Sequence, residues 1–243
     1  VQVSEELFNT IESAIEIAKM TDGAFDPTWA SLWELWKFDG SNIVPTQSQI
    51  NALLPFVDWK QVVLDKKDKT IFLPHGMIGL GGFAKGAALD LVTDTLLDQG
   101  VSDFMIIAGG QVIVQGDARI VGIRKPSAMQ HELIAKVKIK NQSISTTGNY
   151  EKFFMKDGIR YHHIIDPRTG FPAKGMKSVT VISLSATLAD ALSTALFVMG
   201  ADKGLQFIDD IPHTEALFID VDHQLRMSRN FRKFFCDSHS IEG

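Results

Sequence analysis

The spacing of hydrophobic residues at the start of the chain predicts a helix that begins after Ser4. Glu5 and Glu6 would occupy its first turn, where acidic side chains are favoured, and Asp22-Gly23 would end it. Its apolar residues recur at intervals of three and four, which is typical of one buried helical face: Leu7, Ile11, Ala14, Ile15 and Ala18.

A second helical pattern follows directly. Asp26-Pro27-Thr28 resembles an N-cap followed by a proline at the first helical position. Four large side chains then occupy positions i, i+3, i+4 and i+7: Trp29, Leu32, Trp33 and Trp36. This spacing favours a buried face, an interpretation that we prefer to tryptophans stacking on an aromatic ligand.

Patterns further along the chain predict strands and two hairpins. Turn residues indicate one hairpin between 61–64 and 70–73 and another, around Asp157-Gly158, between 150–155 and 159–165. Helices are expected over 83–97 and around residue 190, and strands at 104–108, 112–115, 119–123, 134–139, 177–183 and 216–221. Helices that alternate with antiparallel hairpins predict an α+β fold of layered mixed or antiparallel sheets with packed helices. No linker divides the chain, so we expect residues 1–243 to form a single domain.

Composition and charge exclude several classes of function. The chain has 243 residues, of which 45% are hydrophobic and 22% charged, as in an ordinary globular protein. Its net charge of -5 and the lack of a long basic run indicate that nucleic acid is not a partner. No stretch reaches the ~18 apolar residues that a membrane span needs. Cys236 is alone, so no intrachain disulfide forms.

Residues 187–195 offer the first candidate chemistry. Asp190 and Thr194 are four residues apart in a segment with a helical pattern, so that their oxygens share one helical face. Two oxygen donors from one turn suit Mg²⁺, which takes few protein ligands and completes its shell with water and phosphate. An aspartate early in a helix could instead simply complement the helix dipole.

Two glycine clusters precede this segment. The first, at 79–86, lies between a strand-like run and a helix, where free N–H groups could bind phosphate and Lys85 could add a positive charge. The second, at 108–111, ends an apolar strand. Both are also compatible with simple tight turns.

His162 and His163 lie before a turn formed by 166–170, on an incoming strand that would place their side chains on opposite faces. One of them should face inward. A histidine here could remove a proton from a hydroxyl group, or it could be a core residue held by backbone hydrogen bonds.

Taken in order, these segments resemble the FAD:protein FMN transferase family, the ApbE-type flavin transferases, over nearly the whole chain. The matching stretches are 22–28 (DGAFDPT), 35–36 (LW), 80–86 (LGGFAKG), 109–110 (GG), 121–126 (VGIRKP), 145–150 (STTGNY), 163–170 (HIIDPRTG), 178–181 (SVTV) and 189–195 (ADALSTA).

The resemblance implies a reaction and a set of roles. Such enzymes bind FAD and Mg²⁺, transfer FMN to a threonine or serine hydroxyl of an acceptor redox protein at an Asp-x-x-Thr/Ser-type site, and release AMP. By position, His163 would be the general base, with Asp190 also in the catalytic centre. The remaining roles also come by position: Asp190, Thr194 and the carbonyl of Gly82 would bind the metal, and FAD would contact Asp26, Thr28, Gly81, Gly82, Lys85 and Ile164.

The chain departs from the family pattern at Gly79, where the family usually has Asp, and at Gln111, where Asn or Asp is common. We also expect a missing N-terminal segment before Val1, which could carry a signal or a lipid anchor as the route to a membrane. By resemblance the protein would be an extracytoplasmic lipoprotein. Two alternatives stay open: an Mg²⁺-dependent FAD pyrophosphatase, which yields FMN and AMP, and a catalytically weak FAD-binding protein.

Overall fold

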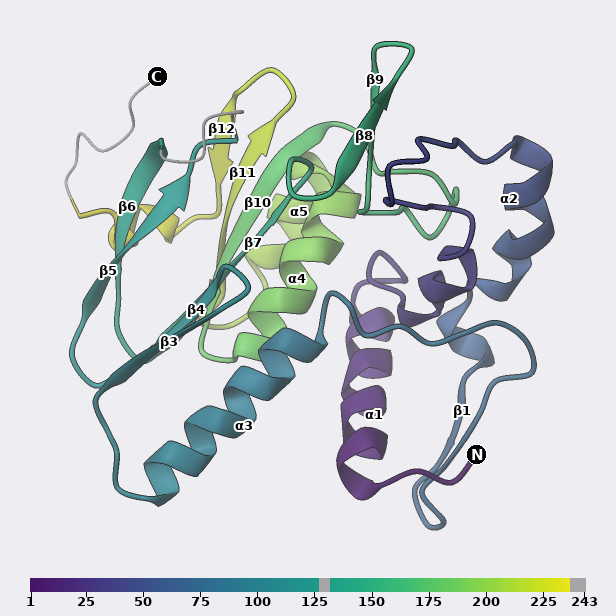
Figure 1. Ribbon diagram of the computed structural model, residues 1–243. Helices are drawn as coiled ribbons and strands as arrows, with labels where there is room; N and C mark the ends of the chain where they lie inside the picture. The colour runs from purple at the N-terminus through teal and green to yellow at the C-terminus, as the bar shows by residue number, and fades with distance from the viewer. Residues whose placement is uncertain (127–131, 237–243) are drawn as a thin grey trace. The chain divides into compact units, whose positions relative to one another are not determined.

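The computed structural model describes residues 1–126 and 132–236 (Figure 1). Its contacts divide the chain into two compact units, each made of two separate segments. Unit 1 comprises Val1–Gly81 and Glu151–Lys174, and unit 2 comprises Gly82–Tyr150 and Gly175–Gly243. The expectation of a single domain stays a prediction.

Unit 2 is built on an antiparallel sheet. Within the described residues this sheet has six strands in the order β12-β11-β10-β7-β4-β3. The strands are β3 (Phe104–Ala108), β4 (Gln111–Gln115), β7 (Gln142–Gly148), β10 (Met176–Ser183), β11 (Glu215–Asp220) and β12 (Leu225–Met227).

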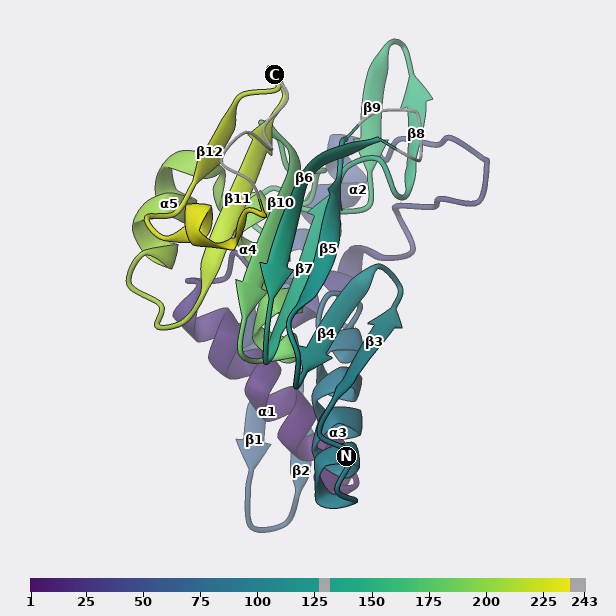
Figure 2. The same ribbon diagram turned by 90° about the vertical axis from the view of Figure 1, so that its left-hand side faces the viewer.

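Both faces of this sheet are covered, which explains why the central strand β10 is buried along almost its whole length. Helix α4 (Ala186–Met199) packs on β7 and β10, and it also contacts α3 (Ala84–Asp98) and α5 (Ala201–Ile208). On the other face lies the hairpin of β5 (Arg119–Arg124) and β6 (Leu133–Ile139), with the 3-10 helix Phe231–Phe234 (Figure 2). Their apolar side chains form one cluster with the sheet, centred on Val114, Val137, Ile182 and Phe231.

An acidic side chain of α3 caps the N-terminus of α4. The Asp90 carboxylate accepts hydrogen bonds from Ser185 Oγ at 2.8 Å, from the N–H of Ala186 at 2.8 Å and from the N–H of Thr187 at 2.9 Å. Ser185, the N-cap of α4, accepts in turn from the N–H of Leu188. Asp90 therefore satisfies N–H groups that a helix start leaves without partners, and it fixes α3 against α4.

Unit 1 combines one long helix with short elements. Helix α1 (Glu5–Met20) begins at the N-cap Ser4 as predicted, and the 3-10 helix η1 (Pro27–Leu32) follows. The remaining elements are α2 (Gln47–Leu53), the 3-10 helices Leu54–Phe56 and Trp59–Gln61, the hairpin of β1 (Val63–Asp65) and β2 (Thr70–Phe72), and the hairpin of β8 (Phe153–Lys156) and β9 (Ile159–His162).

The predicted fold class is confirmed, and most predicted elements are present. The buried residues of α1 are in part different from those expected: Phe8 and Ile17 are buried, whereas Leu7 is exposed and Ile15 is half-buried. The buried face expected from Trp29 to Trp36 is wrong in part, because η1 ends at Leu32 and Trp33 is 50% exposed. The predictions did not include α2, α5, β7 and β12.

Replacement of Asp90 by alanine should lower the free energy of unfolding by about 2 kcal/mol, because Ser185 and two backbone N–H groups lose their acceptor. Urea denaturation followed by circular dichroism measures this loss. Asp94→Ala, an exposed position on the same helix, is the matched control. Equal losses in the two variants would contradict the capping role.

Candidate functional site

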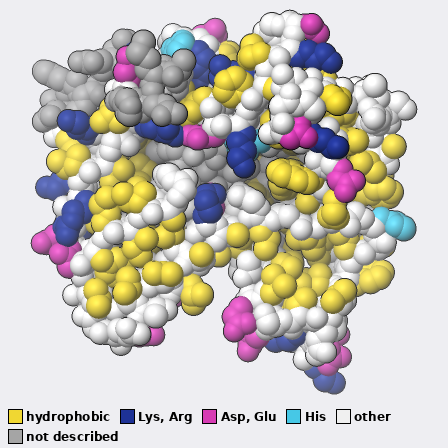
Figure 3. Space-filling view, in the orientation of Figure 1, with side chains coloured by type: hydrophobic (Ala, Val, Ile, Leu, Met, Phe, Trp, Pro, Cys, Tyr) yellow, Lys and Arg dark blue, Asp and Glu magenta, His cyan; other side chains and the backbone are white. Residues whose placement is uncertain are grey.

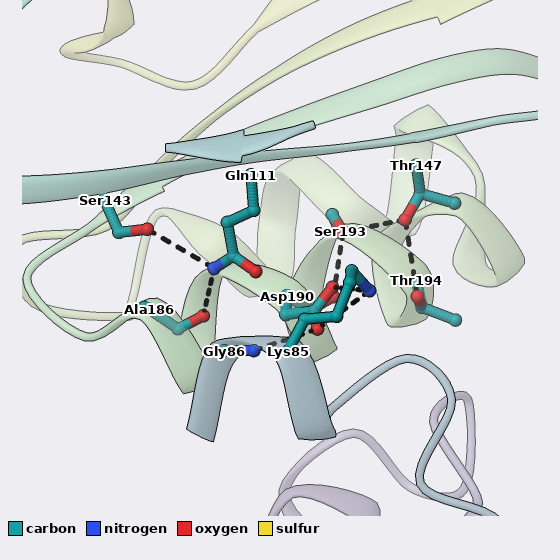
Figure 4. A network of polar contacts seen from close by, with 9 residues as sticks. All are labelled: Lys85, Gly86, Gln111, Ser143, Thr147, Ala186, Asp190, Ser193 and Thr194. Carbon is teal, nitrogen blue, oxygen red and sulfur yellow. Dashed lines mark hydrogen bonds and ion pairs between the residues drawn. The ribbon is translucent and has the colours of Figure 1, made fainter. Parts of the chain in front are cut away.

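The predicted metal ligand Asp190 lies on α4 and points at the start of α3 (Figure 4). Lys85 Nζ lies 3.1 Å and 3.2 Å from the two carboxylate oxygens, and the N–H of Gly86 donates to one of them at 3.3 Å. The Asp190 side chain is 5% exposed. The N-cap of α3, Phe83, provides no side-chain cap, so Asp190 supplies from another helix an acceptor that α3 lacks.

Gly86 makes this close approach between the helices possible. A Cβ at this position would lie 2.4 Å from Ala186 O and 2.6 Å from Thr187 Cα. Both are backbone atoms of α4, so a larger residue would separate the helices. The glycine cluster at 79–86 thus includes a helix-packing position as well as a turn.

The hydroxyl groups beside Asp190 form a directional chain (Figure 4). Ser193 Oγ donates to the Asp190 carbonyl oxygen at 2.8 Å and lies 2.7 Å from Thr147 Oγ1, which lies 3.3 Å from Thr194 Oγ1. Because Ser193 uses its proton on the carbonyl, Thr147 donates to Ser193 and Thr194 donates to Thr147. The Thr194 oxygen therefore keeps its lone pairs for a ligand.

Thr147 is a residue of this site that the sequence analysis placed only within a motif. It comes from β7, a strand that was not predicted, so no local pattern indicated that it lies near α4.

The packing of unit 2 explains Gln111, one of the departures from the family pattern. It is 1% exposed, and its Nε2 donates to Ala186 O at 2.6 Å, which ties β4 to the first residue of α4.

Asp26 and Thr28 lie in unit 1, where they bind each other and the local backbone. Asp26 Oδ1 accepts from the N–H of Thr28 at 2.8 Å and from its hydroxyl at 2.6 Å, and Oδ2 accepts from the N–H of Trp59 at 3.0 Å. Burial raises the pKa of the Asp26 carboxyl above its ordinary value. The pair caps η1, and its contact with FAD stays a prediction.

Gly79 also has a local explanation in unit 1. Its N–H donates to Pro27 O at 2.8 Å, and a Cβ there would lie 2.7 Å from Ala30 Cβ. The Ala30 methyl group of η1 therefore leaves little room for the aspartate of the family pattern.

Of the two histidines, His162 is the one that faces inward. It is 4% exposed; its Nε2 lies 2.9 Å from Ala173 O, and its Nδ1 accepts from the N–H of Ile164 at 3.3 Å. A carbonyl oxygen can only accept, so the proton is on Nε2. Burial lowers the pKa of His162 to about 4. Its hydrogen bonds and burial fit the core-residue interpretation.

His163, the predicted base, is half-buried after the end of β9. Its N–H donates to Lys152 O at 3.1 Å, and its Nδ1 lies 3.2 Å from the same oxygen. This contact places the ring proton on Nδ1 and makes Nε2 the basic atom. The neighbouring Ile164 is buried, and its carbonyl accepts from the N–H of Ala173.

The predicted site residues thus form two sets, one in unit 2 and one in unit 1. In unit 2 the structure brings together Lys85, Asp190 and Thr194, and Gly82 precedes the N-cap of α3. The members in unit 1 are Asp26, Thr28, Gly81, His163 and Ile164. Among the described residues no group of three histidine, cysteine or acidic side chains could hold a metal ion, and no helix is long and apolar enough to cross a membrane.

The sequence matches the ApbE family over residues 1–218. The FAD:protein FMN transferase of Klebsiella pneumoniae (strain 342) is 36% identical over 233 residues, covering 94% of this chain and 73% of that protein. The FAD:protein FMN transferase of Treponema pallidum (strain Nichols) is 34% identical over 252 residues, covering 94% of this chain and 69% of that protein.

Solved structures of ApbE proteins are also similar to this chain. The ApbE protein of Thermotoga maritima superimposes with a TM-score of 0.90 at 36% identity, covering 98% of this chain and 80% of that one. The flavin transferase ApbE of Vibrio cholerae gives a TM-score of 0.84 at 30% identity, covering 96% of this chain and 78% of that one.

The buried His162 makes stability depend on pH. Its pKa falls from 6.5 in the unfolded chain to about 4 in the folded one, so the unfolded chain binds the proton first as the pH falls. The free energy of unfolding should therefore decrease by about 3 kcal/mol between about pH 6.5 and pH 4. Urea titrations across this range measure the decrease.

His162→Gln should flatten this part of the profile, whereas His75→Gln, at an exposed histidine of the same unit, should leave it unchanged. A profile in His162→Gln as steep as that of the unmodified chain would show that another group titrates.

Proposed function

The chain belongs to the ApbE family, and we propose that it transfers FMN from FAD to a threonine or serine hydroxyl of an acceptor redox protein with the help of Mg²⁺. Its curated relatives are FAD:protein FMN transferases, and the chain is an enzyme of this kind. The proposal concerns the metal, the residues and the acceptor. The observation that carries it is the contact of Lys85 with Asp190 where α3 begins, with Thr194 one turn further along α4.

The donor set around Asp190 fits Mg²⁺. It consists of oxygens, with the buried carboxylate of Asp190 on the same helical face as the Thr194 hydroxyl, whose lone pairs the hydroxyl chain leaves available. The carboxylate already balances one positive charge, that of Lys85. Mg²⁺ prefers one or two carboxylates plus substrate phosphates to a cage of protein ligands. When bound, it would neutralise charge on the pyrophosphate.

The proposed reaction exchanges the phosphoanhydride bond of FAD for a phosphoester bond to the acceptor. The acceptor hydroxyl oxygen forms a bond to the phosphorus of the FMN half, the bond from that phosphorus to the bridging oxygen breaks, and AMP leaves with the bridging oxygen. Lys85 would bind the negative charge of the phosphates. Nε2 of His163 would take the hydroxyl proton, while the Lys152 carbonyl holds the ring through Nδ1.

Two further parts of the proposal rest on the family resemblance alone. The acceptor would carry an Asp-x-x-Thr/Ser-type site, and the protein would act as a lipoprotein on the outer side of the cytoplasmic membrane.

The test incubates the chain with FAD, Mg²⁺ and a synthetic peptide that carries an Asp-x-x-Thr site. The peptide should gain the mass of FMN less one water, and AMP should appear in equal amount. Asp190→Asn should reduce the transfer rate at least about 100-fold, because the neutral amide is a poor ligand for Mg²⁺. The increase in melting temperature that Mg²⁺ and FAD cause in the unmodified chain should disappear as well.

Asp94→Asn, on the exposed side of α3, is the control for the loss of a carboxylate. Release of AMP at the same rate without the peptide, with no gain in peptide mass, would favour the pyrophosphatase instead. Transfer by Asp190→Asn at the unmodified rate would remove the metal assignment.

His163→Ala should lower the transfer rate by about 10²–10⁴-fold without a change in FAD affinity, since a general base acts on the acceptor hydroxyl. Transfer by His163→Ala at the unmodified rate would assign the base to another residue. His75→Ala serves as the control.

A further inference from the structure

The β8–β9 hairpin of unit 1, drawn as a ribbon in Figure 1, exposes large hydrophobic side chains. Hydrophobic side chains at the surface are yellow in the space-filling view (Figure 3). Phe153 is 39% exposed, Met155 49% and Ile159 55%. Within the described residues β8 and β9 pair with each other as a two-stranded sheet. Apolar side chains gathered on one exposed hairpin are typical of a surface that binds a partner.

The stem of this hairpin is firmly anchored. Phe154 stacks on Tyr161 with ring centroids 5.4 Å apart, and Tyr161 stacks on the buried Trp36 at 5.9 Å. Phe38 packs against Phe154 at 5.9 Å. The outer residues are therefore held on a rigid aromatic base, which lowers the entropy cost of binding a partner there.

The candidate base His163 is fixed at the foot of the same hairpin. The backbone N–H and Nδ1 of His163 both contact the carbonyl oxygen of Lys152, the residue just before β8. The His163 ring also lies edge-on to Phe38, 6.5 Å away. Any polypeptide that presents a hydroxyl to His163 must therefore approach close to this hairpin.

The charge of the hairpin differs in sign from that of the whole chain. Residues 151–160 contain three exposed cations, Lys152, Lys156 and Arg160, and two acidic residues, Glu151 and Asp157, so their net charge is 3 − 2 = +1, against -5 for the chain. The Arg160 guanidinium lies 4.2 Å from the centre of the Phe153 ring. Basic groups beside apolar ones complement a segment that carries acidic and hydrophobic residues.

We propose that the β8–β9 hairpin is the docking surface for the acceptor protein, an inference that rests on the proposed function. Met155 pairs with Arg160 across the hairpin, and side chains alternate along a strand, so Phe153, Met155 and Arg160 share one face. An extended acceptor segment covers Phe153 and Met155, and its acidic residues, among them the aspartate of the Asp-x-x-Thr/Ser site, face Arg160. Docking there delivers the target hydroxyl to His163.

The test is a kinetic comparison with the Asp-x-x-Thr peptide as the probe. The double variant Phe153→Glu/Met155→Glu should raise the KM for the peptide about tenfold or more, because it removes apolar contacts and repels acidic residues. The KM for FAD, FAD binding followed by flavin fluorescence, and the melting temperature should stay unchanged. In the unmodified chain, added salt should also raise the KM for the peptide.

Phe72→Glu is the matched control, because Phe72 is 61% exposed on a strand of the other two-stranded hairpin of unit 1. The docking role is overturned if the double variant and the control have the same KM for the peptide. It is also overturned if the double variant loses FAD binding as well. Absence of FMN transfer by the unmodified chain would reject the proposed function, and docking with it.

Discussion

Two carboxylates that cap each other's helices hold the site of unit 2 together. Asp90 on α3 binds the first turn of α4, and Asp190 on α4 binds the start of α3. Each helix thus supplies the acceptor that the other needs at its positive end. Gly86 lets the two backbones approach closely enough for both contacts. The same carboxylate that organises α3 is therefore the one that we expect to bind the metal.

This arrangement gives Asp190 a fixed position before any ligand binds. A side chain that was free to rotate would lose conformational entropy on binding a metal and a substrate. Lys85, Gly86 and the helix backbone already restrain this carboxylate, and the hydroxyl chain through Thr147 restrains Thr194. Preorganisation of this kind is what phosphoryl transfer requires of a protein, because catalysis depends on position and charge.

The sequence predicted those parts of the fold that have strong local signals. Helices α1 and α4 begin directly after their serine N-caps, and β3 ends at its glycine turn. Strand β7 was missed because its serine and threonine residues suggest a loop, although Ser143 and Ser145 are buried in the sheet. The exposure of Trp33 was not predicted because a 3-10 helix does not maintain the spacing of an α-helix.

Local sequence signals likewise predicted only part of the site. The positions of Asp190 and Thr194 on one helix followed from their spacing, whereas Lys85 and Thr147 join them from α3 and β7 through tertiary contacts. The alternation of side chains along a strand predicted that one histidine faces inward, but not which one. The answer depends on where β9 ends, because the chain leaves the strand at His162.

The division of each unit between two sequence segments has a consequence for biosynthesis. The aromatic cluster of unit 1 joins Trp36 and Ile50 to Phe154 and Ile165, and Trp36 Nε1 donates to the carbonyl of Gly170, 134 residues further along. Closing so long a loop costs entropy before these contacts can form. On the ribosome, the residues around Trp36 must therefore wait until Gly170 has been made, and in that interval their apolar side chains are open to chaperones.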